Sequence, residues 1–291
     1  MEEPSYLNSI RVKSPKPDPQ HSAESSFARL KERIAAADLG KLRHLNSIYQ
    51  KWAIAASVAL ILAIGGMLYL STSPRELELD VATNVSGKVK RLTLADGTTV
   101  AMNVGSKLIY PKAFTASRRE VFLVGEAYFE VAHNARKPFT VRAGDLGINV
   151  LGTKFNVKAY PNDKYITTTL LEGKVVVENT ITKANQPLTP NQAAVYNQAS
   201  GVSSTETRAE AANSISWLQG TIKMDEMSLE DICLQLERVY NVRITIVTES
   251  LKHKRFNGEF HYNENLEDFL QVLQITTAFK YQISKGTVII S

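Results

Sequence analysis

The sequence contains a single cysteine, Cys233, so the chain cannot form an intramolecular disulfide. It has no Cys-x-x-Cys pair and no cluster of histidine and cysteine at metal-ligand spacing, which argues against a metal site. Cys233 follows the apolar Ile232 in a predicted helix, and no neighbour in sequence would lower its pKa. We interpret it as a buried thiol rather than a reactive one.

A long run of basic residues is also missing, although the formal net charge is +5. Basic and acidic residues are interleaved after residue 70, which is typical of a solvated surface and argues against direct binding of nucleic acid. No catalytic constellation stands out, since His133 is the only histidine in residues 81–202 and has no partner motif. We predict a protein that is not an enzyme and that uses no cofactor and no metal.

The sequence does contain one long apolar stretch, residues 52–70, without a charged residue. A helix of this length just crosses the hydrocarbon layer of a bilayer, which is roughly 30 Å thick. Trp52 and Tyr69 stand at its ends, where amphipathic rings favour the interface. A buried core helix would need a polar face, and a signal peptide would not follow a long polar head. We predict a single transmembrane helix.

The charges beside this stretch predict its orientation. Three basic residues precede it after the last acid, namely Lys41, Arg43 and Lys51, and three acids follow it, namely Glu76, Glu78 and Asp80. The basic flank of a membrane helix stays in the cytoplasm. We therefore expect a single-pass inner-membrane protein with residues 1–51 in the cytoplasm and residues 71–291 in the periplasm.

The cytoplasmic part reads as a tether followed by short helices. Three prolines in Pro15–Gln20 favour an extended chain. Phe27, Leu30 and Ile34 then recur at helical spacing, and Gly40 separates them from a second apolar set further on. A segment this short cannot bury an apolar face by itself. We predict that these three side chains contact a partner protein.

Residues 81–202 have the pattern of an all-β domain. Short alternating runs are separated by glycine turns, and no helical pattern lies between them. Asp96-Gly97 is a strong signal for a hairpin. The spacing predicts a sandwich, a barrel or a β-roll or solenoid.

The remaining residues begin with a small, polar stretch at 203–215, which we interpret as a linker. Residues 216–291 then contain an internal repeat, because Ser228–Ile246 aligns without gaps to Asn265–Ile283. Each copy reads as a helix with a good N-cap that runs into a strand, and each is preceded by a further strand, WLQGTIKM (Trp217–Met224) or RFNGEFHY (Arg255–Tyr262). The pattern predicts a small α+β domain of two βαβ-like halves, with a final strand at Thr287–Ile290.

A series of motifs occurs in order over about residues 85–200. They are LADGTTVAMNVGSKLIYP, LVGEAYFEVAHNARKPFTVRAG, VLGTKFNVKAY, LLEGKVVV and LTPNQAAVY. Together they resemble the FecR family of transmembrane anti-sigma regulators. The C-terminal repeat is similar to the domain that follows FecR domains in Gram-negative proteins, and to the short N-terminal domain of secretins and TonB-dependent receptors. Many members begin with a tryptophan-rich helical domain, whereas residues 1–51 contain no tryptophan.

The resemblance implies an anti-sigma factor that couples an outer-membrane TonB-dependent transporter to an extracytoplasmic-function (ECF) sigma factor. Residues 1–51 would hold the sigma factor, and the signalling domain of the transporter would contact residues 216–291. The final strand, with Thr287, Val288, Ile289 and Ile290, looks exposed in the sequence. We therefore expect the transporter domain to dock there by strand addition.

Two other functions remain open from the sequence. The protein could be a membrane-anchored periplasmic scaffold that binds no sigma factor, an alternative that the short N-terminal segment favours slightly. It could also be an envelope hydrolase, but no set of nucleophile, base and orienting residue can be identified. Binding of a cytoplasmic partner to residues 1–51 distinguishes the anti-sigma factor from the scaffold.

The pair Gly152-Thr153 has two interpretations. In the first, the glycine is a bulge or kink in a strand and Thr153 is an ordinary strand residue. In the second, the Thr153 hydroxyl attacks the Gly152 carbonyl and the resulting ester is hydrolysed, which needs a strained peptide and a base. The sequence identifies no base, and His133 and Asp145 are near the bond only in sequence. Some FecR-type regulators that this chain resembles are reported to cut themselves at a Gly-Thr bond in the same motif.

Overall fold

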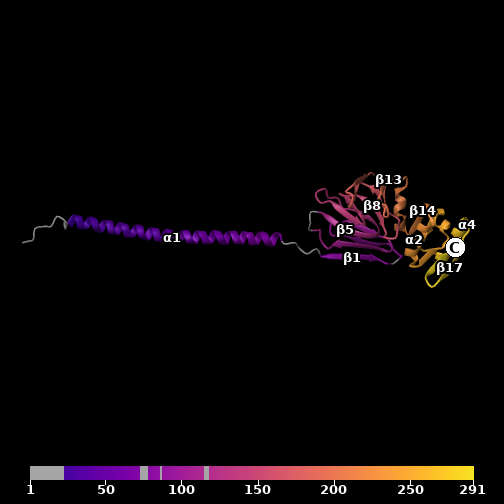
Figure 1. Ribbon diagram of the computed structural model, residues 1–291, viewed down its shortest axis with the longest axis horizontal. Helices are drawn as coiled ribbons and strands as arrows, with labels where there is room; N and C mark the ends of the chain where they lie inside the picture. The colour runs from indigo at the N-terminus through magenta and orange to yellow at the C-terminus, as the bar shows by residue number, and fades with distance from the viewer. Residues whose placement is uncertain (1–22, 73–77, 86, 115–117) are drawn as a thin grey trace, which may run out of the picture. The chain divides into compact units, whose positions relative to one another are not determined.

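The computed structural model describes residues 23–72, 78–85, 87–114 and 118–291 (Figure 1). The chain divides into two compact units, Met1–Arg75 and Glu76–Ser291. The proline-containing tether predicted at residues 15–20 lies outside the described residues.

The first unit contains one helix, α1 (Ala23–Thr72). Its part from Asn46 to Tyr69 is long and apolar enough to cross a membrane, and none of it is buried within the structure. The predicted break at Gly40 is wrong, because α1 continues through this residue. A glycine costs only about 1 kcal/mol in a helix, and the alanines that precede it are the strongest helix formers.

The second unit begins with a thirteen-stranded sheet. Its strands are β1 (Leu79–Asn84), β2 (Lys90–Thr93), β3 (Thr99–Met102), β4 (Ser106–Pro111), β5 (Arg119–Glu130), β6 (Phe139–Ala143), β7 (Leu146–Val150), β8 (Lys154–Ala159), β9 (Tyr165–Glu172), β10 (Val175–Asn179), β11 (Asn185–Leu188), β12 (Gln192–Asn197) and β13 (Ser203–Thr207). The main path runs β11-β10-β7-β6-β5-β8-β9-β12-β13. The side chain of Gln186 in β11 donates to Thr205 in β13, so the two ends of the path meet and the sheet is nearly closed, like a barrel (Figure 1).

Strand β5 organises this sheet. It is 12 residues long, and it pairs with β4 and β6 along its first half and with β3 and β8 along its second half. Gly125, between the two halves, has a φ of +102°. A Cβ atom at this position would lie 2.7 Å from the Cα of Ser106, so only glycine lets β4 and β5 approach this closely. The sheet halves therefore fold over one core, in which Phe129 and Phe155 stack with ring centroids 5.2 Å apart.

The predicted hairpin at Asp96-Gly97 is confirmed, since it joins β2 to β3. Gly97 has a φ of +85°, and the Asp96 carboxylate accepts the backbone N–H of Thr98 at 3.0 Å. The prediction of a linker at residues 203–215 is wrong. These residues form β13, which pairs with β12, and the start of the 3-10 helix η2 (Ala211–Gln219). All five residues of β13 are exposed, so the polar composition reflects a solvated strand rather than a flexible connection.

The C-terminal residues form short helices and strands around a second, separate core. The elements are β14 (Thr221–Ser228), α2 (Leu229–Tyr240), β15 (Arg243–Ile246), α3 (Glu249–Lys252), β16 (Arg255–His261), α4 (Leu266–Thr276), β17 (Tyr281–Ser284) and β18 (Thr287–Ile290). The N-caps predicted for α2 and α4 are confirmed. Ser228 Oγ accepts the N–H of Asp231 and Asn265 Oδ1 accepts the N–H of Glu267, each at 3.1 Å. The strand predicted from Trp217 begins only at Thr221, because the preceding residues belong to η2.

The internal repeat has a simple structural meaning. The leading strands of the two copies, β14 and β16, pair with each other in an antiparallel ribbon. The trailing strands, β15 and β17, flank β18, which is parallel to β15 and antiparallel to β17.

This arrangement overturns one prediction about the final strand. β18 lies in the centre of its sheet, and its residues Val288 and Ile290 are fully buried. The strand looks like an edge in the sequence because it comes last, but both of its edges are already paired. Thr287–Ile290 therefore cannot accept a partner strand, and among the described residues the unpaired edges of this sheet belong to β15 and β17.

Candidate functional site

The three predicted contact residues of the N-terminal part lie on α1 with their side chains in solvent. Phe27, Leu30 and Ile34 are 73%, 53% and 55% exposed. Their spacing places them on one face of the helix. Large apolar side chains gathered on one exposed helix face are typical of a surface that binds a partner.

The C-terminal part also exposes apolar side chains. Ile275 of α4 is 83% exposed and Val272, on the same helix, 56%. Ile283 of the edge strand β17 is 42% exposed. This apolar set lies in the part of the chain that carries the free edges of the three-stranded sheet, so edge and apolar contacts are available together there.

The pair Gly152-Thr153 lies in the bend between β7 and β8, not inside a strand as predicted. A Cβ atom on Gly152 would lie 2.6 Å from Nδ1 and 2.7 Å from Cα of His133, so the packing of His133 requires glycine here. Thr153 is 5% exposed, and its hydroxyl donates to the carbonyl of Lys174 at 2.9 Å. The Asp145 carboxylate accepts the hydroxyl of Tyr196 at 2.9 Å. Of His133 and Asp145, the structure packs His133 against Gly152.

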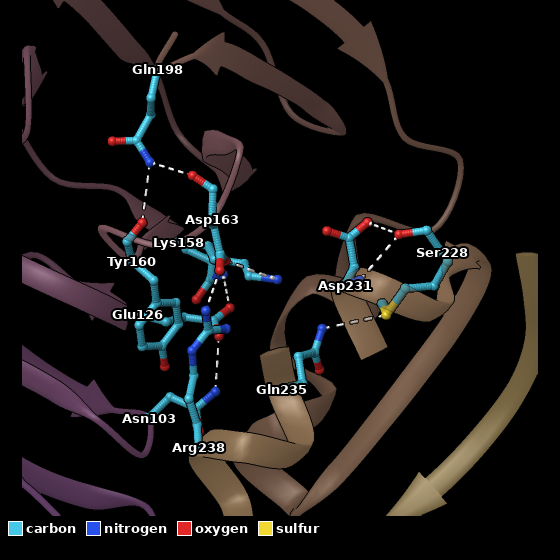
Figure 2. Close-up of polar contacts among 12 residues, drawn as sticks. Asn103, Glu126, Lys158, Tyr160, Asp163, Gln198, Ser228, Asp231, Gln235 and Arg238 are labelled. Carbon is cyan, nitrogen blue, oxygen red and sulfur yellow. Dashed lines mark hydrogen bonds and ion pairs between the residues drawn. The ribbon is translucent and has the colours of Figure 1, made fainter. Parts of the chain in front are cut away.

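A cluster of charged and aromatic side chains joins the β sheet to α2 (Figure 2). Arg238 of α2 forms an ion pair with Asp163, and the two side chains are only 14% and 9% exposed. The guanidinium carbon lies 3.8 Å from the centroid of the Tyr160 ring, which is a close cation–π contact. Lys158 Nζ lies 3.6 Å from the other carboxylate oxygen of Asp163. Asp163 thus interacts with one cation from each side of the contact.

The loop after β8 holds Asp163 in place for this contact. The amide of Gln198 donates to the carbonyl of Tyr160 at 3.1 Å and to that of Asp163 at 2.6 Å (Figure 2). The Tyr160 hydroxyl donates to the carbonyl of Val104 at 2.7 Å, and burial raises its pKa. The hydrogen bond to Val104 holds the Tyr160 ring in place, and Arg238 stacks on that ring. A second polar contact crosses between the same two parts, from the Tyr262 hydroxyl to Asn103 Oδ1 at 3.4 Å.

A buried carboxyl group lies behind this cluster. Glu126 of β5 is 8% exposed, and its two oxygens accept the side-chain amides of Asn156 at 2.9 Å and Asn103 at 2.8 Å. Burial raises the pKa of Glu126, although Lys158, the two amides and Arg238 partly oppose this.

No pattern in the sequence indicates this cluster. Glu126 alternates with Ala127 and Phe129, which fill the core, so the strand pattern assigns Glu126 to a solvated outer face. In the structure that face is covered by η2 and the C-terminal residues. Arg238 and Asp163 are 75 residues apart, and nothing in their neighbouring residues marks them as partners.

Sequence profiles of two protein families match the chain. The FecR protein profile matches residues 80–176, and the profile of the FecR C-terminal domain matches residues 221–290. No protein with a curated description matches the sequence.

Two solved structures are similar to this chain in sequence and fold. Both are crystal structures of a candidate anti-sigma factor from Parabacteroides distasonis ATCC 8503, at 1.65 Å and 2.50 Å resolution. Their sequences are 31% and 32% identical to this chain, with TM-scores of 0.68 and 0.67. Each match covers 73% of this chain and 98% of the solved one. The chain belongs to the FecR family, and the family and these neighbours support a regulatory, anti-sigma role.

Proposed function

We propose that this protein is an anti-sigma factor that couples a TonB-dependent outer-membrane transporter to an ECF sigma factor. The observation that carries the proposal is α1, because one unbroken helix contains both an exposed apolar face and a stretch that can span a membrane. In the proposed arrangement residues 1–51 are cytoplasmic, residues 52–70 cross the inner membrane, and the FecR domain (81–202) and the C-terminal domain (216–291) are periplasmic.

The sigma factor binds the face formed by Phe27, Leu30 and Ile34. Transfer of one such side chain out of water contributes about 1.5–3 kcal/mol, so three of them supply several kcal/mol. Co-purification of the full chain with ECF sigma factors of the same cell tests this, with the double variant Leu30→Asp, Ile34→Asp expected to lose the partner. The matched control is Glu32→Gln, a polar change on the same helix. If no sigma factor co-purifies with the unchanged chain, the scaffold alternative takes its place.

The transporter's signalling domain docks on the C-terminal domain. Strand addition on β15 or β17 replaces the predicted docking on β18, because in the part of the chain that the structure describes β15 and β17 each have an unpaired edge and β18 has none. Ile283→Pro on β17 removes an edge N–H, whereas Ile283→Ala keeps it. A reporter gene under the sigma factor should lose its response to the transporter's ligand with proline and retain it with alanine. Equal responses of the proline and alanine variants would show that β17 is not part of the interface.

We also propose that cleavage of the Gly152-Thr153 bond is one step of the signalling. His133, which packs against Gly152, is the base that the geometry offers. The present hydrogen bond from Thr153 to Lys174 points the hydroxyl to a different carbonyl and has to break first. Mass spectrometry of the purified protein tests for a fragment that begins at Thr153. Thr153→Ser should keep that fragment and Thr153→Ala should abolish it, while an intact chain leaves packing against His133 as the sole role of Gly152.

A further inference from the structure

A cavity of about 790 Å³ lies between the outer face of the β sheet and the C-terminal residues. Strands β8 and β9 contribute polar side chains to its wall, η2 contributes Trp217, and β14 contributes the residues from Thr221 to Asp225. None of the functions proposed above uses this cavity.

The cavity meets β14 along its edge. Successive residues of a strand point to opposite faces, so a cavity that touches five consecutive residues cannot lie over one face only. β14 pairs with β16 on one side, and no strand of the described residues pairs with its other side. The unpaired side of β14 is therefore the side that borders the cavity.

The hydrogen-bond alternation of the ribbon identifies the residue whose backbone faces the cavity. The N–H of Tyr262 donates to the carbonyl of Gly220 at 2.7 Å, and the register pairs Ile222 with Phe260. Backbone groups alternate between the two edges of an antiparallel strand, so those of Thr221 and Lys223 point away from β16. The carbonyl of Thr221 accepts the hydroxyl of Ser216 at 3.0 Å, which agrees with this assignment. No backbone or side-chain hydrogen bond from another described residue reaches the N–H or C=O of Lys223, so both are left for another partner.

The chemistry of the wall indicates what that partner is. The charged lining residues balance, with three cations and three acids: Lys158, Arg208, Lys223, Glu126, Glu210 and Asp225. Asn156 Oδ1 and Trp217 Nε1 belong to residues that line the cavity, and both atoms are buried without a hydrogen-bond partner among the described residues. One accepts and the other donates, and a peptide group offers both complements once these side chains turn.

We propose that this cavity binds an uncharged, extended polypeptide segment of another protein, which pairs with Lys223 along the free edge of β14. The segment lies between the FecR domain and the C-terminal residues and adds a third strand to the β14–β16 ribbon. This site differs from the edges of β15 and β17, so the inference does not depend on where the transporter docks.

Fluorescence of Trp217 tests the proposal directly. The chain has two tryptophans, so Trp52→Phe in the full-length protein leaves Trp217 as the only emitter. The probe is the blocked peptide acetyl-Thr-Val-Thr-Val-Thr-amide. We expect a saturable change in Trp217 emission, and no saturable change up to the solubility limit of the peptide overturns the proposal.

Two variants at position 223 distinguish strand pairing from nonspecific binding of the peptide. Lys223→Ala keeps the backbone N–H and should bind the peptide like the unchanged chain. Lys223→Pro removes that N–H from an edge where the ladder to β16 does not need it, and binding should weaken about tenfold or more. Equal affinities of the two variants contradict the proposal. The fully N-methylated peptide gives the same test from the ligand's side if the proline variant does not fold, and its binding with unchanged affinity also contradicts strand pairing.

Discussion

Replacing Arg238 by alanine should loosen the C-terminal residues from the β sheet. The change leaves the buried Asp163 carboxylate with Lys158, 3.6 Å away, as its remaining cation. Breaking a buried ion pair from one side costs about 3–5 kcal/mol, and loss of the stacking on Tyr160 adds to this. Since Lys158 compensates in part, we expect a fall of about 3 kcal/mol in the free energy of unfolding. Arg238→Lys keeps the charge but loses the planar stacking, so about 1 kcal/mol is expected.

Urea unfolding of residues 76–291, followed by circular dichroism, measures these changes. The double variant Arg238→Ala, Asp163→Asn completes a mutant cycle, because removal of the carboxylate charge relieves the penalty that the single Arg238→Ala change creates. A coupling energy below about 0.5 kcal/mol would show that the two residues are merely adjacent. Two separate transitions in the Arg238→Ala variant, where the unchanged protein has one, would show directly that this contact joins the two cores.

Glu126→Gln should flatten the dependence of stability on pH. Because the pKa of Glu126 is raised in the folded state, the native protein binds the extra proton, and stability falls as the pH rises from 4.5 to the folded pKa. Urea titrations at a series of pH values should find this slope in the parent and not in the variant. Asn103→Ala removes one amide that lowers the pKa of Glu126, so the fall in stability should extend to higher pH. Gly152→Ala should lower the free energy of unfolding by about 1–3 kcal/mol, because its Cβ would press on the backbone of His133; a calorimetric melting temperature unchanged from that of the parent refutes this packing role. Cys233, which is 4% exposed and whose pKa burial raises to about 12, should react with a thiol reagent only after denaturant is added.

Local patterns in the sequence predicted local structure well. The capping residues Ser228 and Asn265, the Asp96-Gly97 turn and the apolar stretch of α1 act within a few residues, so their sequence signals are sufficient. The predicted helix break at Gly40 was wrong because the strong helix formers beside this glycine outweigh its tendency to end a helix. The prediction of a linker at residues 203–215 failed because a polar composition indicates only that residues are exposed. An exposed strand and a linker have the same composition.

The candidate site could not be predicted because it depends on pairing over long distances. β18 follows β17 in sequence but pairs also with β15, and this parallel pairing removes the edge that the sequence seemed to offer. The alternation of β5 places Glu126 on its outer face, and the sequence does not show what covers that face. Both cases depend on the same step, which is how a finished element is buried by another part of the chain.

The continuity of α1 restricts how a signal can travel through it. Phe27 and Asn46 belong to the same helix and are separated by roughly 28 Å at about 1.5 Å per residue. The backbone hydrogen bonds between them are those of a single helix, so a rotation or a piston movement of the part that can span a membrane would be passed along the helix to the face of Phe27. Each register step of one residue would turn that face by about 100°. Gly40 has no side chain, so it is the position at which the helix would bend or unwind first under such a twist.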